Sequence, residues 1–405
     1  MMSKEKRRVP KLRFPGFTED WEQRELAELC NVYDGTHQTP RYTNSGVMFV
    51  SVENIKTLES DKYISEDDFK NEFKIFPEFG DILLTRIGDV GSANIILDNI
   101  KRAYYVSLAL LKPKGVNSLF LLALLSSASV QSEIWKRTLH IAFPKKINKN
   151  EISKVIVSKP SILEQKKIGE LIYALDQIIT LHQRKLDNLK LKKKALLQKL
   201  FPKNGERYPE LRFPGFTDAW EQRKLGDLAE IVRGASPRPI SDPKWFDNDS
   251  SVGWLRIADV TAQDGRIRYL EQKISELGQE KTRVIKTPHL LLSIAATVGK
   301  PVINYVPTGV HDGFLIFLNP KFNILYTFWW LEMFREKWNK YGQPGSQVNL
   351  NSDLVKNQVI NIPNEKEQEK ISSFLESLDK IITLHQRKLD HLQLQKKALL
   401  QQMFV

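Results

Sequence analysis

Two loops of the sequence collect polar side chains that can hydrogen-bond to the edges of nucleic-acid bases. They are residues 35–42 (GTHQTPRY) and residues 233–239 (RGASPRP). Such side chains read base edges or hold phosphates, so both loops are candidate DNA contacts. A plain polar loop is the other interpretation, and it stays open. The candidate residues are His37, Gln38, Thr39, Arg41 and Tyr42 in the first loop, and Arg233, Ser236 and Arg238 in the second.

Two further pairs of segments carry similar residues at matching places. Residues 85–91 and 296–300 each contain a glycine, which permits close approach of backbone to phosphate, although a tight turn alone explains them equally well. Residues 140–146 (HIAFPKK) and 341–347 (YGQPGSQ) offer lysines for phosphates and amides for base edges. The candidates in these four segments are Arg86, Thr297, Lys300, Lys145, Lys146, Gln343, Ser346 and Gln347.

The motifs of common catalytic sites are missing from the chain. No Pro-Pro pair occurs, so the Asn-Pro-Pro or Asp-Pro-Pro motif of adenine methylases is absent. The phosphate-loop pattern fails where Gly299-Lys300 is followed by Pro301, and no Pro-Asp dipeptide begins a nuclease signature. We therefore expect no catalytic residue, no metal site and no enzyme activity of this chain alone.

Charge and cysteine content limit the class of protein. The chain carries 61 Lys and Arg against 48 Asp and Glu, a net charge of +13, which favours an anionic partner such as nucleic acid over a merely solubilising surface. Cys30 is its single cysteine, which excludes an internal disulfide and suits the reducing cytoplasm. No run of 18 apolar residues predicts a membrane span.

The sequence contains an internal duplication. Residues 12–29 (LRFPGFTEDWEQRELAEL) return as residues 211–228, and residues 175–201 return as residues 378–404 with 21 of 27 positions identical. The segments between these repeats share a skeleton of glycines, prolines and strand-like runs but differ in detail. A scaffold that is kept while its inserts diverge suggests related but unlike tasks.

The period predicts two mixed α/β domains, each followed by a long helix. Strand-like runs at residues 47–52 and 254–260, and at 81–87 and 289–295, indicate β-rich cores, and residues 118–137 and 325–340 each read as an amphipathic helix. The predicted parts are a first domain at 12–160, a first helix at 161–201, a linker at 202–210, a second domain at 211–363 and a second helix at 364–404.

Both long helices carry a heptad seam, which predicts an antiparallel coiled coil joining the two pseudo-symmetric domains (fold class α+β). His182 and His385 occupy equivalent seam positions, so we expect them to meet and to fix the register. A metal or proton-relay role is the other interpretation, and neighbouring acids show no ligand spacing. If the halves are equivalent, the segment at Leu12 docks beside Phe404.

The duplicated LRFPGF-x₃-WEQR openings, the proline-ended strands at 155–160 and 359–363, and the following EQKKI or EQEKI into a long helix resemble the specificity subunits of type I restriction-modification systems. The resemblance covers essentially the whole chain. It implies two target-recognition domains that read a split, asymmetric sequence in double-stranded DNA, with the helices as the spacer.

The resemblance also implies partners. Two modification (methyltransferase) subunits with S-adenosylmethionine would bind this chain, and restriction (endonuclease and translocase) subunits would use ATP and Mg²⁺. The assembled complex would methylate adenine at N6 and cut DNA, and this chain would hold no cofactor. The alternative is a stand-alone, two-lobed nucleic-acid-binding or bridging adaptor without a methylase partner. A fused methylase or nuclease is disfavoured by the missing motifs.

Overall fold

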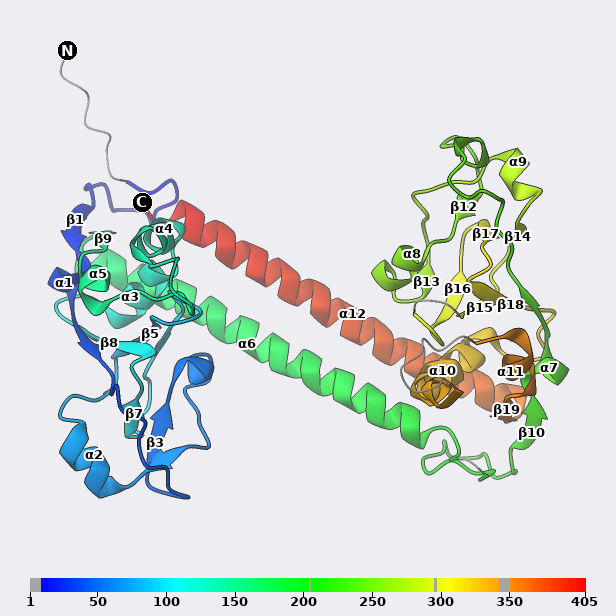
Figure 1. Ribbon diagram of the computed structural model, residues 1–405, viewed down its shortest axis with the longest axis horizontal. Coiled ribbons are helices and arrows are strands. Elements are labelled where there is room, and N and C mark those ends of the chain that lie inside the picture. Colours follow the sequence, from blue (N-terminus) through cyan, green and yellow to red (C-terminus); the bar gives the residue numbers. More distant parts are fainter. Residues whose placement is uncertain (1–8, 204, 295–296, 342–349) are drawn as a thin grey trace, which may run out of the picture. The chain divides into compact units, whose positions relative to one another are not determined.

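The computed structural model describes residues 9–203, 205–294, 297–341 and 350–405 (Figure 1). They form two compact units: the first holds Met1–Arg184 with Gln386–Val405, and the second holds Lys185–His385. Each unit therefore contains one domain and a part of both long helices. The fold class expected from the sequence is confirmed, since two mixed domains are joined by the helices α6 (Ile162–Lys199) and α12 (Glu365–Gln402).

The first domain is built from three small sheets and five short helices. The sheet orders are β1–β9, β2–β8–β5–β6 and β4–β3–β7. The strands are β1 (Glu22–Glu25), β2 (Cys30–Asp34), β3 (Val47–Val50), β4 (Tyr63–Ile64), β5 (Ile82–Thr85), β6 (Ala93–Ile95), β7 (Arg102–Tyr104), β8 (Leu108–Pro113) and β9 (Ile156–Lys159). The helices are α1 (Leu26–Leu29), α2 (Glu66–Glu72), α3 (Ser118–Leu125), α4 (Ala128–Arg137) and α5 (Lys149–Ser153), with the 3-10 turn η1 (Val52–Asn54).

The second domain repeats this plan with changes at its margins. Its sheet orders are β10–β19, β11–β18–β15–β16–β13 and β12–β17–β14. The strands are β10 (Glu221–Lys224), β11 (Glu230–Arg233), β12 (Gly253–Trp254), β13 (Arg266–Ile267), β14 (Arg283–Ile285), β15 (Leu290–Ser293), β16 (Pro301–Asn304), β17 (Thr308–Val310), β18 (Phe314–Leu318) and β19 (Val359–Ile362). The helical segments are α7 (Leu225–Leu228), η2 (Pro243–Trp245), α8 (Ile257–Ala262), α9 (Glu276–Gln279), α10 (Ile324–Phe334), η3 (Arg335–Tyr341) and α11 (Ser352–Asn357).

Four strands form a common frame in both domains. The order β2–β8–β5–β6 matches β11–β18–β15–β16, and all of these neighbours are antiparallel. A parallel pair, β3 with β7 and β12 with β17, lies in the second sheet of each domain. The third strand differs, because β4 joins β3 whereas β14 joins β17. The domains are thus variants of one frame.

Two expectations from the sequence are wrong in detail. Residues 118–137 do not form one helix, because α3 and α4 meet at a 65° bend; the hydroxyl of Ser127 caps the new start by accepting from the backbone NH of Val130. The strand expected at 254–260 ends at Trp254 and gives way to α8, where the carboxylate of Asp259 accepts from the backbone NH of Arg256. In both segments a side chain caps the start of a helix, and the structure there differs from the one that the apolar sequence predicted.

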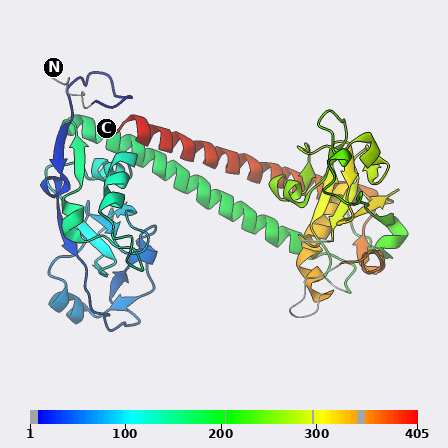
Figure 2. The ribbon, with the colours of Figure 1, turned by 45° about the horizontal axis from the view of Figure 1, so that its top comes forward.

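The long helices run antiparallel inside each unit, side by side in both views (Figures 1 and 2). In the first unit Lys396 forms an ion pair with Asp176 at 2.5 Å, and in the second unit Lys193 forms one with Asp379. These are equivalent residues of the duplicated helices, since 379 follows 176 and 396 follows 193 by the same 203 positions. The same ion pair is therefore made twice.

The seam histidines can be placed in this register. Counting heptad positions from the two ion pairs sets His182 level with Leu389 in the first unit, and His385 level with Leu186 in the second. Both leucines are buried and both histidines are partly exposed. The role of the histidines in fixing the register stays a prediction.

The repeated opening segments close each unit in the same way. The backbone NH of Leu12 donates to the carbonyl of Gln402 at 2.9 Å, and Leu211 does the same to Lys199 at 2.9 Å. The Phe404 ring lies 6.0 Å from the Trp21 ring, edge to face. The predicted docking of the Leu12 segment beside Phe404 is confirmed.

An ion pair accompanies each closure. Arg13 donates through two nitrogens to the fully buried Glu164, at 2.7 and 2.8 Å. Arg212 makes the same bidentate pair with the fully buried Glu367, at 2.8 Å for both bonds. Two parallel bonds to a planar carboxylate fix the geometry of both side chains. The opening segments are therefore part of the scaffold.

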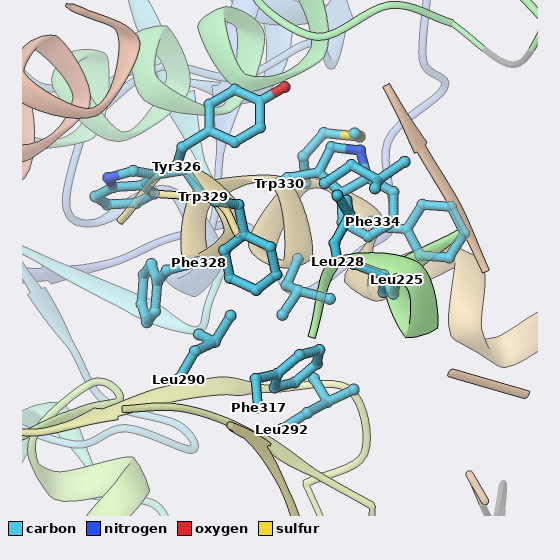
Figure 3. Close-up of a cluster of buried hydrophobic side chains, with 14 of the residues drawn as sticks. Leu225, Leu228, Leu290, Leu292, Phe317, Tyr326, Phe328, Trp329, Trp330 and Phe334 are labelled. Atoms are coloured by element: carbon cyan, nitrogen blue, oxygen red, sulfur yellow. The ribbon is translucent and has the colours of Figure 1, made fainter. Parts of the chain in front are cut away.

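Aromatic side chains fill the core of the second unit between α10 and the central sheet (Figure 3). Trp329, Trp330 and Trp338 are at most 4% exposed. Trp21 and its repeat Trp220 are likewise buried and pack in the cores of their units. Among the described residues no single helix is long and apolar enough to cross a bilayer; α3 and α4 pass that test only as a bent pair, and most of their apolar side chains lie in the domain core.

Candidate nucleic-acid interface

Buried Arg86 joins the three segments of the first domain that the sequence singled out. Its guanidinium donates to the carboxylate of Asp34 and, through Nε, to the carbonyl of Ile147 at 3.2 Å. Its own carbonyl accepts from the backbone NH of Ile147 at 2.9 Å. Since Asp34 precedes loop 35–42 and Ile147 follows loop 139–146, the three segments are fixed in one place.

The burial of Arg86 decides how it can act. The residue is 7% exposed, and desolvation lowers the pKa of its guanidinium, although arginine stays protonated. A side chain so enclosed holds the loops together, and its burial is unfavourable for the direct DNA contact that the sequence suggested. Asp34, which the sequence analysis missed, supplies the opposite charge.

Loop 35–42 presents all five of its predicted contact residues to solvent. Gly35 packs so closely that a Cβ atom there would lie 2.5 Å from the backbone carbonyl of Tyr105, so only glycine fits. The backbone NH of Thr36 then donates to the carbonyl of Tyr104 at 3.1 Å. The start of the loop is thereby held against the frame, and the exposed residues follow it: His37, Gln38, Thr39, Arg41 and Tyr42.

Loop 139–146 is also anchored at its base. Leu139 donates its backbone NH to the carbonyl of Lys146 at 2.7 Å, and Gly88 donates to the carbonyl of Lys145 at 2.8 Å. Lys145 and Lys146 are exposed, and the Nζ of Lys145 lies 4.7 Å from the centre of the Trp135 ring. Both lysines are therefore available to phosphates beside the segment 86–91.

In the second domain the carboxylate of Asp312 holds the loop 233–239 in place. It accepts from the hydroxyl of Ser236 at 2.7 Å and from the guanidinium of Arg238 at 2.8 Å. Arg233 donates through Nε to the backbone carbonyl of Asp312 at 2.6 Å. The three predicted residues of loop 233–239 thus converge on one acid, and the hydrogen bond from Ser236 followed by the charge of Arg238 lowers the pKa of its carboxyl.

Gly234 shows that this loop occupies the same place as its counterpart. A Cβ atom on Gly234 would lie 2.2 Å from the carbonyl oxygen of His311, so the close approach seen at Gly35 recurs here. The backbone NH of Ala235 donates to Val310 at 3.0 Å, as Thr36 does to Tyr104. Because Val310 corresponds to Tyr104, Asp312 of the second domain corresponds to Val106 of the first.

Of the second pair of segments, residues 297–300 lie inside the second domain. Lys300 is 8% exposed, donates to Asp264 at 2.6 Å and forms an ion pair with Glu332 at 2.6 Å. Burial would lower the pKa of its ammonium, but the two carboxylates, Glu332 and then Asp264, outweigh it and raise that pKa. Lys300, like Arg86, is neutralised within its domain, while Thr297 is partly exposed. The predicted contacts Gln343, Ser346 and Gln347 lie outside the described residues.

The family comparison agrees with this architecture. The family model for the type I restriction modification DNA specificity domain matches residues 18–191 and again residues 217–394. The two matches cover most of the chain and coincide with its duplication. The chain belongs to this family, whose members are the DNA specificity subunits of type I restriction-modification systems.

Individual relatives are distant. The putative type I restriction enzyme MjaX specificity subunit of Methanocaldococcus jannaschii is 23% identical over 403 residues, which span 94% of this chain and 92% of that one. The type I restriction-modification S subunit from M. genitalium has a TM-score of 0.65 at 13% identity, covering 98% and 99% of the two chains. A chain from a study of assembly and conformational transition in the type I R-M system has a TM-score of 0.54 at 15% identity, covering 96% and 98%. The structural likenesses support the fold.

Proposed function

We propose that this chain reads a split, asymmetric DNA target, with each domain selecting one part, and that it positions modification and restriction subunits on that DNA. The observation that best supports this proposal is a pair of loops that start at equivalent places of the shared strand frame but carry different polar side chains. Loop 35–42 and loop 233–239 both start at a glycine pressed against the backbone. Identical placement with different polar side chains suits recognition of two different half-sites.

The charged groups near the loops support unlike specificity. The first loop follows Asp34, which accepts from Arg86 inside the domain, and it leaves Arg41 exposed. The second loop holds Arg238 through Asp312 while the Arg238 side chain stays 73% exposed. A guanidinium held by one edge and open at the other is suited to a bidentate contact with guanine. We expect Arg238 to read a base and Arg41 to contact base or phosphate.

The long helices offer equal surfaces for two partner subunits. Apolar side chains off the coiled-coil seam remain exposed at equivalent positions of the two helices, with nearly equal exposure. They are Leu171 (38%), Ile178 (44%), Leu181 (67%) and Leu191 (67%) on α6, and Phe374 (38%), Ile381 (44%), Leu384 (63%) and Leu394 (65%) on α12. Matched apolar patches mark interaction sites, and their duplication supports binding of two modification subunits.

The chemistry of the assembly belongs to the partners in this proposal. The modification subunits supply S-adenosylmethionine and methylate adenine, the restriction subunits supply ATP and Mg²⁺, and this chain works in the cytoplasm without a cofactor of its own. Among the described residues, His, Cys, Asp and Glu side chains do not cluster as a metal site would require. The loops described above provide binding groups, and the carboxylates of Asp34 and Asp312 outside them are paired with Arg86 and Arg238.

The test is a map of methylated adenines in host DNA with and without this chain. A bipartite motif that disappears when the chain is removed supports the proposal. Exchanging residues 30–160 for those of another family member should change one half of the motif and leave the other. Tight, specific DNA binding by the isolated chain, with no methylation motif that depends on it, would instead support a stand-alone adaptor.

A further inference from the structure

The tip of loop 139–146 carries two apolar side chains that no described residue of the first unit covers. Ile141 is 99% exposed and Phe143 is 104% exposed, more than any other large hydrophobic side chain of the described residues. Water contact around two large apolar side chains is unfavourable unless a partner removes it. Their position four residues or fewer from Lys145 indicates the kind of partner.

The tip is held rigidly enough to present these side chains. Its base is closed by the bond from Leu139 to Lys146, and Ile147 next to it is tied by two bonds to the buried Arg86. The ring of His140 lies 4.2 Å from that of Trp135 and hydrogen-bonds to the Trp135 carbonyl at 2.9 Å. The apolar side chains therefore project from a fixed base.

The charges around the tip favour a polyanion. Lys145 and Lys146 are exposed, and neither forms an ion pair with a carboxylate in the part of the chain that the structure describes. The acids of the neighbouring helices α4 and α5 are already occupied, because Glu133 pairs with Lys136 and Arg137, and Glu151 pairs with Arg137 and Lys154. Exposed lysines without a carboxylate partner, beside an apolar tip, suit phosphates flanking a base step better than an apolar protein groove.

We propose that Phe143, with Ile141 beside it, is a wedge that inserts between bases of the DNA half-site bound by the first domain. Phenylalanine, isoleucine and proline are among the apolar side chains that DNA-bending proteins push into a base step, partly unstacking it. The tip holds all three types in the run Ile141-Ala142-Phe143-Pro144. Lys145 and Lys146 then neutralise phosphates on either side. The inference rests on the proposed DNA recognition and adds a structural change in the DNA.

The experiment uses the complete chain in complex with its modification subunits. Its duplexes carry the mapped target, with 2-aminopurine placed at successive positions of the first half-site. Unstacking raises the fluorescence of this base analogue. The wild-type complex should raise it at one step, and Phe143→Ala should abolish the rise and weaken binding about 10-fold, since one inserted side chain contributes stacking of that order. Phe143→Leu, which keeps an apolar wedge, should retain much of the signal.

Two controls separate the wedge from other roles. Lys145→Ala should weaken binding to all duplexes and reduce its salt dependence without moving the 2-aminopurine signal. Phe143→Ala should melt at the wild-type temperature, since the side chain is exposed. Wild-type fluorescence and affinity in an Ile141→Ala, Phe143→Ala double variant would overturn the wedge, as would loss of co-purification with the modification subunit, which would assign the tip to a protein partner.

The failure of the wedge can be told from failure of the proposed function. A wild-type complex whose methylation motif does not change when residues 30–160 are exchanged would contradict recognition by the first domain altogether. A double variant that methylates the same motif with unchanged affinity would leave that recognition intact and remove only the wedge.

Discussion

Arg86 donates from the interior of the first domain to the carboxylate of Asp34, whereas in the second domain the exposed Arg238 donates to the carboxylate of Asp312. In each domain a pairing of carboxylate and arginine thus holds a candidate DNA-binding loop in place. The difference lies in which partner is exposed. In the first domain the arginine is enclosed, and in the second it faces solvent.

Replacing Arg86 with alanine should destabilise the first domain. The change leaves the partly buried Asp34 without its cation, and breaking an ion pair of this kind typically costs about 3–5 kcal/mol. Urea unfolding should show the loss, and methylation should lose the first half-site before the second. The exposed Arg41→Ala serves as the control, since it should alter DNA binding without altering the unfolding midpoint. Equal midpoints for the wild type and Arg86→Ala would contradict the role given to Arg86.

Replacing Arg238 with alanine should weaken recognition of the second half-site. Loss of a base contact costs roughly 1–3 kcal/mol and relaxes the choice of base at one position. Methylation rates on a set of single-base variants of that half-site would measure it. Asp312→Asn is the matched variant, because it keeps Arg238 but weakens the bond that orients it, and it should show a smaller loss at the same base. Unchanged rates on every variant would remove Arg238 from the readers.

Much of the framework could be predicted from the sequence because the duplication carries it. The heptad seam predicted both long helices, and the identical openings predicted the closure of Leu12 onto the end of α12. The features that the sequence did not predict depend on contacts between residues far apart in the chain. Arg86 looks like a DNA-binding residue in the sequence, and only the fold shows it enclosed with Asp34, 52 positions away.

The same holds for the organising acids and the helix boundaries. Asp312 stands 74 positions from Arg238, so no local pattern joins them, although its Asp-Gly turn before an apolar strand could have drawn notice. The bend between α3 and α4 follows from the cap at Ser127, which an apolar run conceals. The sequence pattern therefore predicts the shared strands and the long helices, whereas contacts between residues far apart in the chain determine the arrangement of the candidate site.

The second domain should lose stability on mild acidification through His311. Burial lowers the pKa of this ring, with the nearby Asp312 opposing the shift, and its Nδ1 accepts from the backbone NH of Gly313 at 2.8 Å. The folded domain keeps the ring neutral, whereas the unfolded chain takes up a proton below its ordinary pKa of about 6.5. The stabilisation is therefore complete above that pH and is lost as the pH falls towards the lowered pKa of the folded state.

His311→Asn tests this prediction, because the amide oxygen can replace Nδ1 as the acceptor without titrating in this range. Urea unfolding at pH 7.5, 6.5 and 5.5 should show a shallower decline for the variant than for the wild type. The exposed His37→Asn is the control and should follow the wild type. Parallel declines for all three proteins would show that His311 does not set the pH response.

Shortening Phe404 should open the closure of the first unit. The ring packs against Trp21 and Phe120, with centroids 6.0 and 5.8 Å away. Phe404→Ala removes a buried aromatic ring, which typically costs about 3–5 kcal/mol. Phe201→Ala is the equivalent change in the second unit, where the ring lies 6.4 Å from Trp220 and 5.5 Å from Tyr326. Calorimetry should show similar losses for the two variants, and a much smaller loss for Phe404→Ala would mean that the two closures are not equivalent.

An insertion of four residues after Lys190 should change the spacing of the two half-sites that the complex accepts. Four residues add roughly 6 Å to a helix at 1.5 Å each, which is close to the length of two base pairs. The ion pair of Lys193 with Asp379 would have to shift along the seam. His182→Leu combined with His385→Leu is the companion variant, because it replaces both seam histidines with apolar side chains. Methylation of targets whose gaps differ by one base pair would measure the accepted spacing. An unaltered gap in the insertion variant would show that the helices do not set the distance between the two half-sites. If the double leucine variant still accepts a single gap, the histidines do not fix the register of the helices.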